Sequence, residues 1–253
     1  MIWTLIRPKQ AAVEAALFEG VRAVDAASIY GTEREVGRAV RTSGLGKQVL
    51  VTTKLPPAAF SDLRGAVGRS LDALGSGMEK PLVVLHSPLA PKAERLQAYE
   101  RLLEAQAEGL CAGVGVANWG VTHLEALAAA GLPSPALLQL ELSPFNQRAA
   151  IVSWARAQGS AVQAATWSRL SGKTGARNWG KLKAVAQRVG CTPQQALIAW
   201  SLARGFAVAP RALAGSPAVH ENAPAAVSCP PEFLSQLRRN PDHAPRAGRR
   251  RSL

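Results

Sequence analysis

Residues 21–37 read Val-Arg-Ala-Val-Asp-Ala-Ala-Ser-Ile-Tyr-Gly-Thr-Glu-Arg-Glu-Val-Gly. The stretch opens with four residues that are apolar except for one arginine, which predicts a short strand. An acid, Asp25, ends this strand, and a phenol, Tyr30, follows five residues later. A glycine turn then leads into a predicted helix with Thr32 as its N-cap and Glu35 in the position that completes a capping box. An acid at the carboxyl end of a strand, followed by a polar side chain in the next loop, is where parallel α/β proteins place their reactive groups.

Short apolar runs alternate with amphipathic segments on both sides of this stretch. Each of roughly eight predicted strands is followed by one or more predicted helices, which indicates a parallel sheet and, with eight units, a closed α/β barrel of the (β/α)8 (TIM) type. Ser61 and Thr192 are the predicted N-caps of two of these helices. We predict strands at residues 1–6, 21–25, 48–53, 81–85, 111–116, 136–140, 161–166 and 206–209, and helices at residues 10–19, 32–41, 61–74, 92–108, 122–130, 147–158, 178–189 and 192–203.

An open, doubly wound sheet is the alternative architecture. Such a sheet usually shows a glycine-rich phosphate loop after its first strand. The only similar run, Gly113-Val-Gly-Val-Ala-Asn, lacks the third glycine and follows the fifth predicted strand. No repeat or linker divides the chain before about residue 225. We therefore expect one barrel domain over residues 1–225 and a proline-rich, basic C-terminal tail over residues 226–253.

The chain has a formal net charge of +13, with 30 Lys and Arg against 17 Asp and Glu. Such a charge is compatible with a nucleic-acid-binding protein, whose binding would depend steeply on salt. No aromatic residues interleave with the arginines near the C-terminus, which favours a solvated tail, and we expect no nucleic-acid partner. These arginines are Arg238, Arg239, Arg246, Arg249, Arg250 and Arg251.

The cysteines and histidines show no metal-binding or disulfide pattern. Cys111, Cys191 and Cys229 are odd in number and widely spaced, which fits a reduced, cytoplasmic protein. The four histidines have neither HxxxH nor HExxH spacing, so we expect no metal site. There is no run of eighteen apolar residues and no basic segment followed by an apolar core at the N-terminus, so we expect neither a membrane span nor a secretory signal.

Four titratable residues fall at the ends of three neighbouring predicted strands. Asp25 and Tyr30 follow the second strand, Lys54 the third and His86 the fourth. Because the active site of a barrel lies at the carboxyl ends of its strands, we expect these side chains to converge at one mouth. Each of them alone has an ordinary structural explanation, such as a solvated strand end or a packed turn.

The motifs that contain these residues resemble those of the aldo-keto reductase family. The segment that ends at Gly37 is similar to the family signature, Val-Thr-Thr-Lys-Leu to its lysine motif and Leu-His-Ser-Pro to its histidine motif. Three later segments are similar to its cofactor-binding segments, and all six occur in the family order between about Trp3 and Asn222. The later segments are Gly113-Val-Gly-Val-Ala-Asn-Trp, Gln139-Leu-Glu-Leu-Ser-Pro-Phe and Ala207-Val-Ala-Pro-Arg.

The resemblance implies a catalytic tetrad that reduces an aldehyde or ketone to an alcohol. Tyr30 is the implied proton donor, and because a phenol ordinarily has a pKa of ~10, its pKa must be lowered for work near neutrality. Lys54 is the implied cation that stabilises the phenolate, and Asp25 is the partner that holds Lys54. His86 is implied to donate a hydrogen bond to the substrate oxygen and to orient it.

Members of the family bind a nicotinamide dinucleotide, usually NADPH, in an extended form. By resemblance Asn118 and Gln139 hold its carboxamide, although Ala117 stands where many relatives have a serine, which removes one hydrogen bond. Trp167 best matches the aromatic residue that stacks under the nicotinamide, provided that two extra residues are accepted after Gly159. The alternative for Trp167 is a packing role.

The adenosine half of the cofactor has fewer implied contacts than usual. Arg211 occupies the place of the family's phosphate-binding lysine, and a guanidinium can grip a phosphate at two points. Ala218 replaces a second arginine, and Glu221 and Asn222 are implied to face the adenine. Because one phosphate-binding arginine of two remains, NADPH is favoured over NADH.

The sequence departs from the family pattern in further places. The β-hairpin that usually closes the barrel floor has no counterpart before the first predicted strand, and Pro81 replaces an acid that usually precedes the histidine motif. The C-terminal loop that shapes substrate choice in relatives is replaced, so the sequence does not identify the carbonyl substrate. We expect a monomer. The alternative function is a cofactor-binding regulatory or weakly active barrel protein, similar to the channel-associated members of the family, whose basic tail docks a partner.

Overall fold

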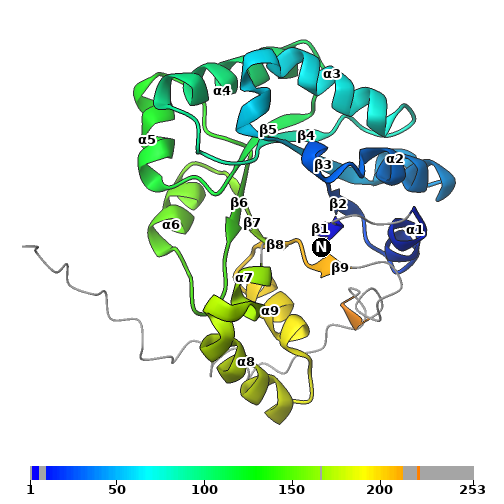
Figure 1. Ribbon diagram of the computed structural model, residues 1–253, viewed down its shortest axis with the longest axis vertical. Coiled ribbons are helices and arrows are strands. Elements are labelled where there is room, and N and C mark those ends of the chain that lie inside the picture. The colour runs from blue at the N-terminus through cyan, green and yellow to red at the C-terminus, as the bar shows by residue number, and fades with distance from the viewer. Residues whose placement is uncertain (1, 6–9, 166, 213–220, 223–253) are drawn as a thin grey trace, which may run out of the picture.

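The structure, a computed structural model, describes residues 2–5, 10–165, 167–212 and 221–222, with residues 2–5, 168, 169, 174, 211 and 212 described in their backbone only. Its strands form one parallel sheet in the order β8-β7-β6-β5-β4-β3-β2-β1-β9. The sheet curls around a central axis with the helices outside it (Figure 1). The strands are β1 Ile2–Leu5, β2 Ala23–Asp25, β3 Leu50–Leu55, β4 Leu82–Leu85, β5 Gly113–Ala117, β6 Leu137–Glu141, β7 Ala161–Ala165, β8 Ala207–Val208 and β9 Arg211–Ala212.

The barrel is closed by an interrupted eighth strand. β8 pairs with β7, whereas β9, two residues further along the chain, pairs with β1 through Thr4 and Arg211. Pro210 lies between the two short pieces and has no N–H to donate to a neighbouring strand, so the strand breaks there. The two pieces together complete the circle of parallel strands, which confirms the predicted (β/α)8 barrel. The predicted tail over residues 226–253 lies outside the described residues.

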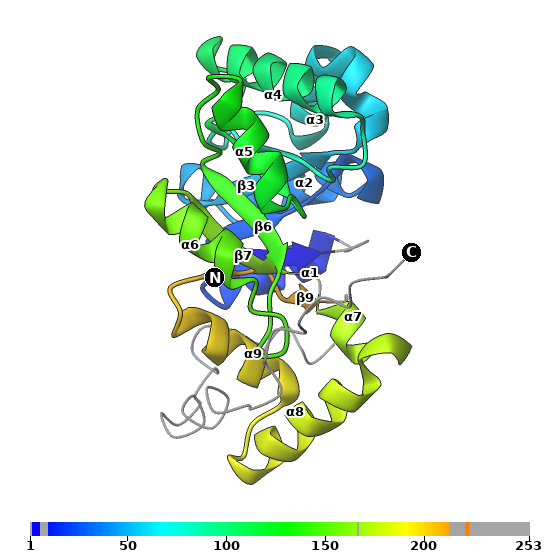
Figure 2. The ribbon, with the colours of Figure 1, turned by 90° about the vertical axis from the view of Figure 1, so that its left-hand side faces the viewer.

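Helices α1 to α6 alternate with the strands, and three helices lie between β7 and β8. Figure 2 shows α8 and α9 at the opposite end of the molecule from α3 and α4. None of the helices within the described ranges is long and apolar enough to span a membrane. The helices are α1 Gln10–Phe18, α2 Glu33–Thr42, α3 Leu63–Leu74, α4 Lys92–Ala107, α5 Val121–Ala129, α6 Ala149–Ala157, α7 Ser168–Ser171, α8 Ala176–Arg188 and α9 Pro193–Leu202, with 3-10 turns η1 Ser28–Tyr30, η2 Gly46–Gln48, η3 Pro57–Asp62 and η4 Lys173–Gly175.

Of the three predicted helix caps, Thr192 is confirmed, Thr32 is at the N-cap position but lacks the capping bond, and Ser61 is wrong. Thr192 caps α9, accepting a hydrogen bond from the Gln195 backbone N–H at 3.2 Å while the Gln195 side chain accepts one from Thr192 N–H at 2.9 Å. Thr32 precedes α2 as predicted but makes no side-chain cap bond. Its backbone angles, φ −116° and ψ 0°, are not the extended ones of a capping residue.

The helix predicted from Ser61 begins at Leu63 instead. Residues Pro57–Asp62 form a 3-10 turn, so the α-helical hydrogen bonds start two residues later. Asp62 is therefore the N-cap of α3, and its carboxylate accepts from the backbone N–H of Gly65 at 3.3 Å. The second strand is likewise shorter than predicted, because Val21 N–H bonds back to the Ala16 carbonyl at the end of α1.

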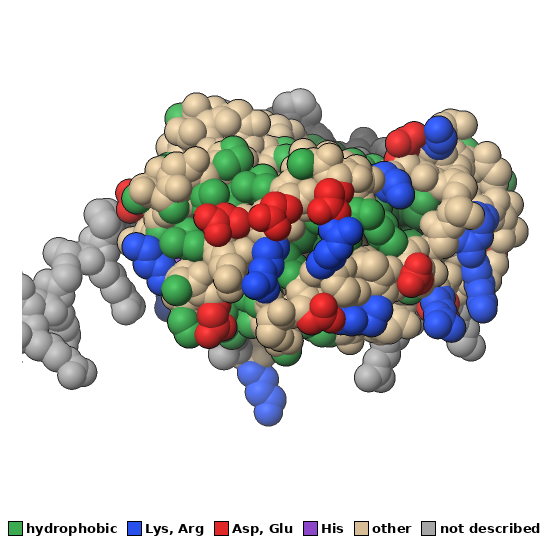
Figure 3. All heavy atoms as spheres, turned by 90° about the horizontal axis from the view of Figure 1, so that it is seen from above, with side chains coloured by type: hydrophobic (Ala, Val, Ile, Leu, Met, Phe, Trp, Pro, Cys, Tyr) green, Lys and Arg blue, Asp and Glu red, His purple; other side chains and the backbone are tan. Residues whose placement is uncertain are grey.

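The outer surface mixes charges of both signs where it can be seen. Over the side on which α3 and α4 lie, Lys and Arg side chains alternate with Asp and Glu (Figure 3). Arg69 and Asp62 form an exposed ion pair there at 2.9 Å. The described residues of this face therefore form a surface of mixed charge rather than a uniform basic patch of the kind that tracks a nucleic-acid backbone.

Candidate active site

Asp25 and Lys54 form a buried ion pair inside the barrel. Asp25 ends β2, and Lys54 lies near the carboxyl end of the neighbouring strand β3. Lys54 Nζ lies 2.5 Å from Asp25 Oδ2 and donates to the Ala26 carbonyl at 2.8 Å, and both charged side chains are 1% exposed. Burial lowers the pKa of Lys54, and the Asp25 carboxylate acts in the opposite direction. The pair therefore fixes an ammonium group at the carboxyl end of two adjacent strands.

Tyr30 is held against this pair by a short 3-10 turn. The turn η1 ends at Gly31, whose φ of 64° lies in the left-handed region that favours glycine. Ser28 Oγ donates to the Lys54 carbonyl at 3.2 Å and thereby ties the turn to β3. The Lys54 ammonium lies 5.2 Å from the centroid of the Tyr30 ring. The turn thus places the ring of Tyr30 beside the buried ammonium group.

His86 follows β4 and faces Tyr30. Its backbone N–H donates to the Leu55 carbonyl at 2.9 Å, which continues the β3–β4 ladder beyond the strand. Its ring lies edge-on to the Tyr30 ring, with centroids 5.8 Å apart and planes at 85°. Burial, reinforced by the Lys54 charge and partly opposed by Asp25, lowers the pKa of His86 to about 4. The imidazole is therefore neutral near pH 7.

The lowered pKa of His86 predicts that the folded state loses stability between pH 6.5 and about 4. In this window the unfolded histidine binds a proton that the folded one does not, so stability falls as pH falls. We expect the free energy of unfolding of the wild type to drop by roughly 2 kcal/mol more than that of His86→Asn between pH 7 and pH 4, after allowance for partial exposure. Urea unfolding at several pH values measures this, and parallel curves for the two proteins would contradict it.

Asn118 and Gln139, expected to hold a carboxamide, lie beside the tetrad. Asn118 follows β5 with a left-handed φ of 64°, and its backbone N–H donates to the Gln139 carbonyl at 2.9 Å. Its side-chain amide lies 3.5 Å from the His86 carbonyl oxygen. Gln139 on β6 donates from Nε2 to Asp25 Oδ1 at 2.9 Å. The two amides therefore share a site with the charged residues.

The other residues expected to bind a cofactor are more scattered. Trp167 follows β7, is 9% exposed and donates from Nε1 to the Leu142 carbonyl at 2.7 Å, a placement that suits the packing role left open for it. Asn222 is 1% exposed, and its Oδ1 has no partner among the described residues. The backbone carbonyl of Glu221 accepts from Gln195 Nε2 at 2.8 Å. Arg211 lies in β9, and its side chain is outside the described part of the structure.

These residues fit a nicotinamide dinucleotide in their chemistry. Asn118 and Gln139 are amides that can complement a carboxamide, and they lie next to the residues that would act on a carbonyl. At the other end, the buried and unpartnered Oδ1 of Asn222 is an acceptor suited to an amino group such as that of adenine. Metal binding has no such support, since the described residues contain no group of three or more His, Cys, Asp or Glu side chains suited to it.

Two contacts that support the site were not predicted. Gln139 Nε2 also donates to Gln163 Oε1 on β7 at 2.8 Å. Thr53 on β3 donates to the buried carboxylate of Glu33 at 2.5 Å, which ties the start of α2 to the strand that carries Lys54. The sequence did contain a signal for the contact of Gln163, because this residue is the lone polar one in the otherwise apolar run Ala-Val-Gln-Ala-Ala. The contact between Thr53 and Glu33 had no signal in the sequence beyond an acid in the first turn of a helix.

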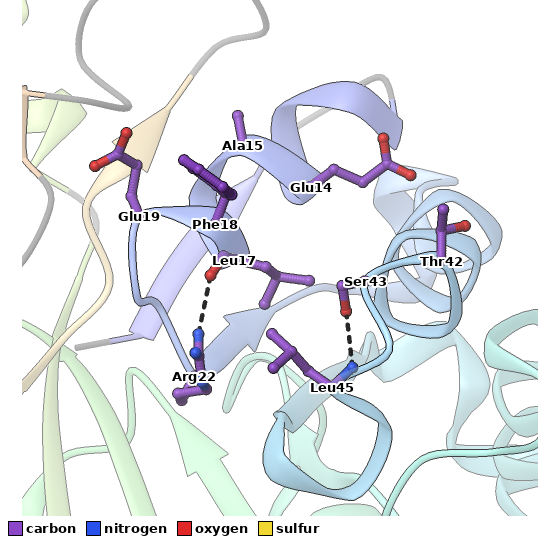
Figure 4. Close-up of a pocket in the computed structure, with 9 residues that line it drawn as sticks. All are labelled: Glu14, Ala15, Leu17, Phe18, Glu19, Arg22, Thr42, Ser43 and Leu45. Carbon is purple, nitrogen blue, oxygen red and sulfur yellow. Dashed lines mark hydrogen bonds between the residues drawn. The ribbon is translucent and has the colours of Figure 1, made fainter.

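A separate groove of about 600 Å³ lies between α1 and the carboxyl end of α2 (Figure 4). It is lined partly by Phe18, which is 90% exposed, and by Arg22, which donates to the Leu17 carbonyl at 2.9 Å. Arg22 precedes β2, so the groove opens at the amino ends of the strands. The tetrad lies at the carboxyl ends, and we assign the groove no part in its chemistry.

A (β/α)8 barrel with a buried Lys–Asp pair, a tyrosine and a neutral histidine at its carboxyl mouth has groups that can donate hydrogen bonds and a proton to an oxygen, as an enzyme acting on carbonyl compounds requires. The family model of the aldo/keto reductase family matches residues 7–220. An aldo-keto reductase of Mycobacterium leprae is 34% identical over 201 residues, covering 78% of this chain and 70% of that protein. Methylglyoxal reductase DkgB of Salmonella typhimurium is 34% identical over 209 residues, covering 79% and 75%.

The solved structures agree. The crystal structure of an aldo-keto reductase enzyme from a Medee basin deep-sea metagenome library matches with a TM-score of 0.81 at 25% identity, over 94% of this chain and 89% of that one. An aldo/keto reductase from Brucella melitensis matches in fold with a TM-score of 0.78 at 24% identity, over 94% and 93%. The chain belongs to the aldo/keto reductase family. It is an NAD(P)H-dependent oxidoreductase of carbonyl compounds.

Proposed function

We propose that this protein reduces small aldehydes to alcohols with NADPH and that Tyr30 supplies the proton. The observation that carries the proposal is the meeting of four side chains at the ends of β2, β3 and β4. Lys54 Nζ lies 2.5 Å from Asp25 and 5.2 Å from the Tyr30 ring centroid, and the His86 ring centroid is 5.8 Å from that of Tyr30. Because several similar proteins, DkgB of Salmonella typhimurium among them, are named methylglyoxal reductases, methylglyoxal is the first substrate to test.

Tyr30 is the acid because the site is built to accept negative charge on its phenol. When the phenol gives up its proton, the Lys54 ammonium, 5.2 Å from the centroid of the Tyr30 ring and itself buried, stabilises the phenolate. Asp25 and the Ala26 carbonyl hold that ammonium in one place, so it needs no reorganisation as the charge develops. Asp25 and Lys54 therefore contribute both a positive charge beside Tyr30 and a fixed position for that charge.

His86 orients the substrate and does not compete as an acid. With its pKa lowered to about 4, the imidazole is neutral at pH 7 and donates one ordinary N–H. A neutral donor beside the phenol can bind the carbonyl oxygen and direct it toward the Tyr30 hydroxyl. The division of roles follows from the pKa of the histidine and from the cation beside the tyrosine.

The nicotinamide supplies the hydride when the cofactor is bound. Asn118 and Gln139 are the residues we propose to hold its carboxamide, because their amides lie beside Asp25 and His86. Asn222, and Glu221 beside it, are proposed to face the adenine. Trp167 is proposed to stack under the nicotinamide, and the alternative for its buried indole is the packing role that its bond to the Leu142 carbonyl suits.

The preference for NADPH rests on Arg211, and it predicts a selective effect of Arg211→Ala. The dissociation constant for NADPH should rise by about 10-fold or more, whereas that for NADH should change by less than about 2-fold, because only NADPH has the 2′-phosphate that a guanidinium can grip. Fluorescence titration measures both constants. Arg188→Ala, an exposed change on α8, is the matched control. Equal weakening of the two cofactors would remove the phosphate role of Arg211.

Turnover is tested by adding methylglyoxal and a panel of simple aldehydes to the protein with NADPH. Aldehyde-dependent loss of the nicotinamide absorbance would support the proposal. Tight binding of NADPH without turnover of any aldehyde would favour the regulatory alternative. Absence of NADPH binding would overturn the cofactor assignment itself.

A further inference from the structure

Gln163 is a fully buried polar residue in the barrel interior for which the reaction gives no direct use. It lies on β7, has no exposed surface and accepts a hydrogen bond from Gln139 Nε2 at 2.8 Å. Its own Nε2 is buried without a partner among the described residues. Accepting from Gln139 is thus the contact that accounts for its presence there.

The chemistry of Asp25 decides which way the Gln139 amide points. The oxygens of an ionised carboxylate can only accept, so the Gln139 atom that lies 2.9 Å from Asp25 Oδ1 must be the nitrogen. The second hydrogen of that nitrogen is directed to Gln163. Both donor hydrogens of Gln139 are therefore used inside the barrel, and its carbonyl oxygen alone is left to meet a ligand.

We propose that Gln163 is a positioning residue that fixes the Gln139 amide so that it presents an acceptor to the cofactor. Asp25 alone would anchor one N–H and leave the amide able to turn about that bond. Gln163 supplies the second anchor from a different strand. The inference rests on the proposed function, because the ligand group that faces Gln139 is taken to be the carboxamide of the nicotinamide.

A fixed Gln139 oxygen should make the site prefer a ligand group that donates a hydrogen bond to it. A group that donates an N–H, such as a primary carboxamide, satisfies the Gln139 oxygen, whereas a methyl ketone in its place leaves that oxygen unpaired. The acetylpyridine analogue of NADP⁺ makes this change, since a methyl group replaces the amino group and the carbonyl oxygen is kept. Affinity for NADP⁺ relative to the analogue therefore reports the orientation of the amide without any turnover.

The test is to measure dissociation constants of NADP⁺ and the acetylpyridine analogue by fluorescence titration for wild type, Gln163→Leu and Gln163→Glu. The wild type should prefer NADP⁺ by about 5-fold, and Gln163→Leu should lower this preference by about 3-fold, because the freed amide can turn its N–H toward the acetyl oxygen. Gln163→Glu should keep the preference, since a carboxyl group in either protonation state offers an oxygen to Gln139.

Thr52→Val is the matched control. Thr52 lies on β3, is also fully buried, and has a hydroxyl without a partner among the described residues, so the change removes a buried polar group that does not contact Gln139 through a hydrogen bond. It should keep the wild-type preference. An unchanged preference in folded Gln163→Leu would overturn the inference. If the wild type binds NADP⁺ but does not discriminate, the inference fails while the cofactor assignment stands. If it binds neither compound, the proposed function fails and the inference with it.

A ligand-free measurement covers the case in which Gln163→Leu does not fold. In the wild type, the side-chain amide hydrogens of Gln139 should exchange with solvent far more slowly than those of Gln187, an exposed glutamine on α8. Nuclear magnetic resonance of the ¹⁵N-labelled protein measures both. Equally fast exchange would show that the two anchors do not hold the amide and would overturn the inference.

Discussion

Replacing Tyr30 by phenylalanine is expected to lower kcat for aldehyde reduction by about 10²- to 10⁴-fold, the usual contribution of a general acid. The change removes one oxygen and leaves the ring against His86 and Lys54. The dissociation constant for NADPH should stay within about 2-fold, because the lost interaction is made only as the proton moves. Stopped-flow turnover and fluorescence titration separate the two quantities.

The chain offers a close control for this change. Tyr99 is its only other tyrosine, is fully buried in the core and donates from its hydroxyl to the Pro133 carbonyl at 2.9 Å. Tyr99→Phe therefore removes the same atom and should cost stability but not turnover. Full activity of Tyr30→Phe, or an equal loss of activity in both variants, would mean that the phenol is not the acid.

The barrel, and the meeting of the four side chains at its mouth, could be predicted because both depend on local features. A strand that ends in an acid, and another that ends in a lysine, are visible in the sequence, and a parallel barrel brings strand ends to one mouth whatever the details of packing. Errors of one or two residues in the strand limits did not matter, as the late start of β2 at Ala23 shows. The reactive side chains still face inward at the carboxyl ends.

The contacts that hold the tetrad in place could not be predicted, because they depend on which side chains meet across the barrel. Gln139 reaches Asp25 over 114 residues of sequence, and its second bond selects Gln163. The pKa of His86 likewise follows from its burial and from a charge on another strand. At Thr32 the capping pattern was present, but the backbone angles are not those of a capping residue and the hydroxyl makes no capping bond.

Lys54→Met should produce the largest loss of stability of any single change at the site. Removing the ammonium leaves the Asp25 carboxylate buried without its counter-ion, and breaking such a pair costs about 3–5 kcal/mol in the free energy of unfolding. The exposed pair of Lys47 and Glu79, 3.9 Å apart with side chains 80% and 53% exposed, provides the control. Lys47→Met should have little effect, because solvent already screens that pair.

The double variant Asp25→Asn/Lys54→Met separates the stability of the pair from its chemistry. It removes both buried charges and keeps an oxygen at position 25 for the Gln139 amide, so most of the stability lost in Lys54→Met should return. Turnover should stay as low as in the single variant, because the cation that stabilises the phenolate is still missing. Urea unfolding and NADPH oxidation measure the two effects on the same samples. A Lys54→Met protein as stable as Lys47→Met would show that Asp25 is not a buried charge in need of compensation, and recovery of turnover in the double variant would show that Tyr30 does not depend on Lys54.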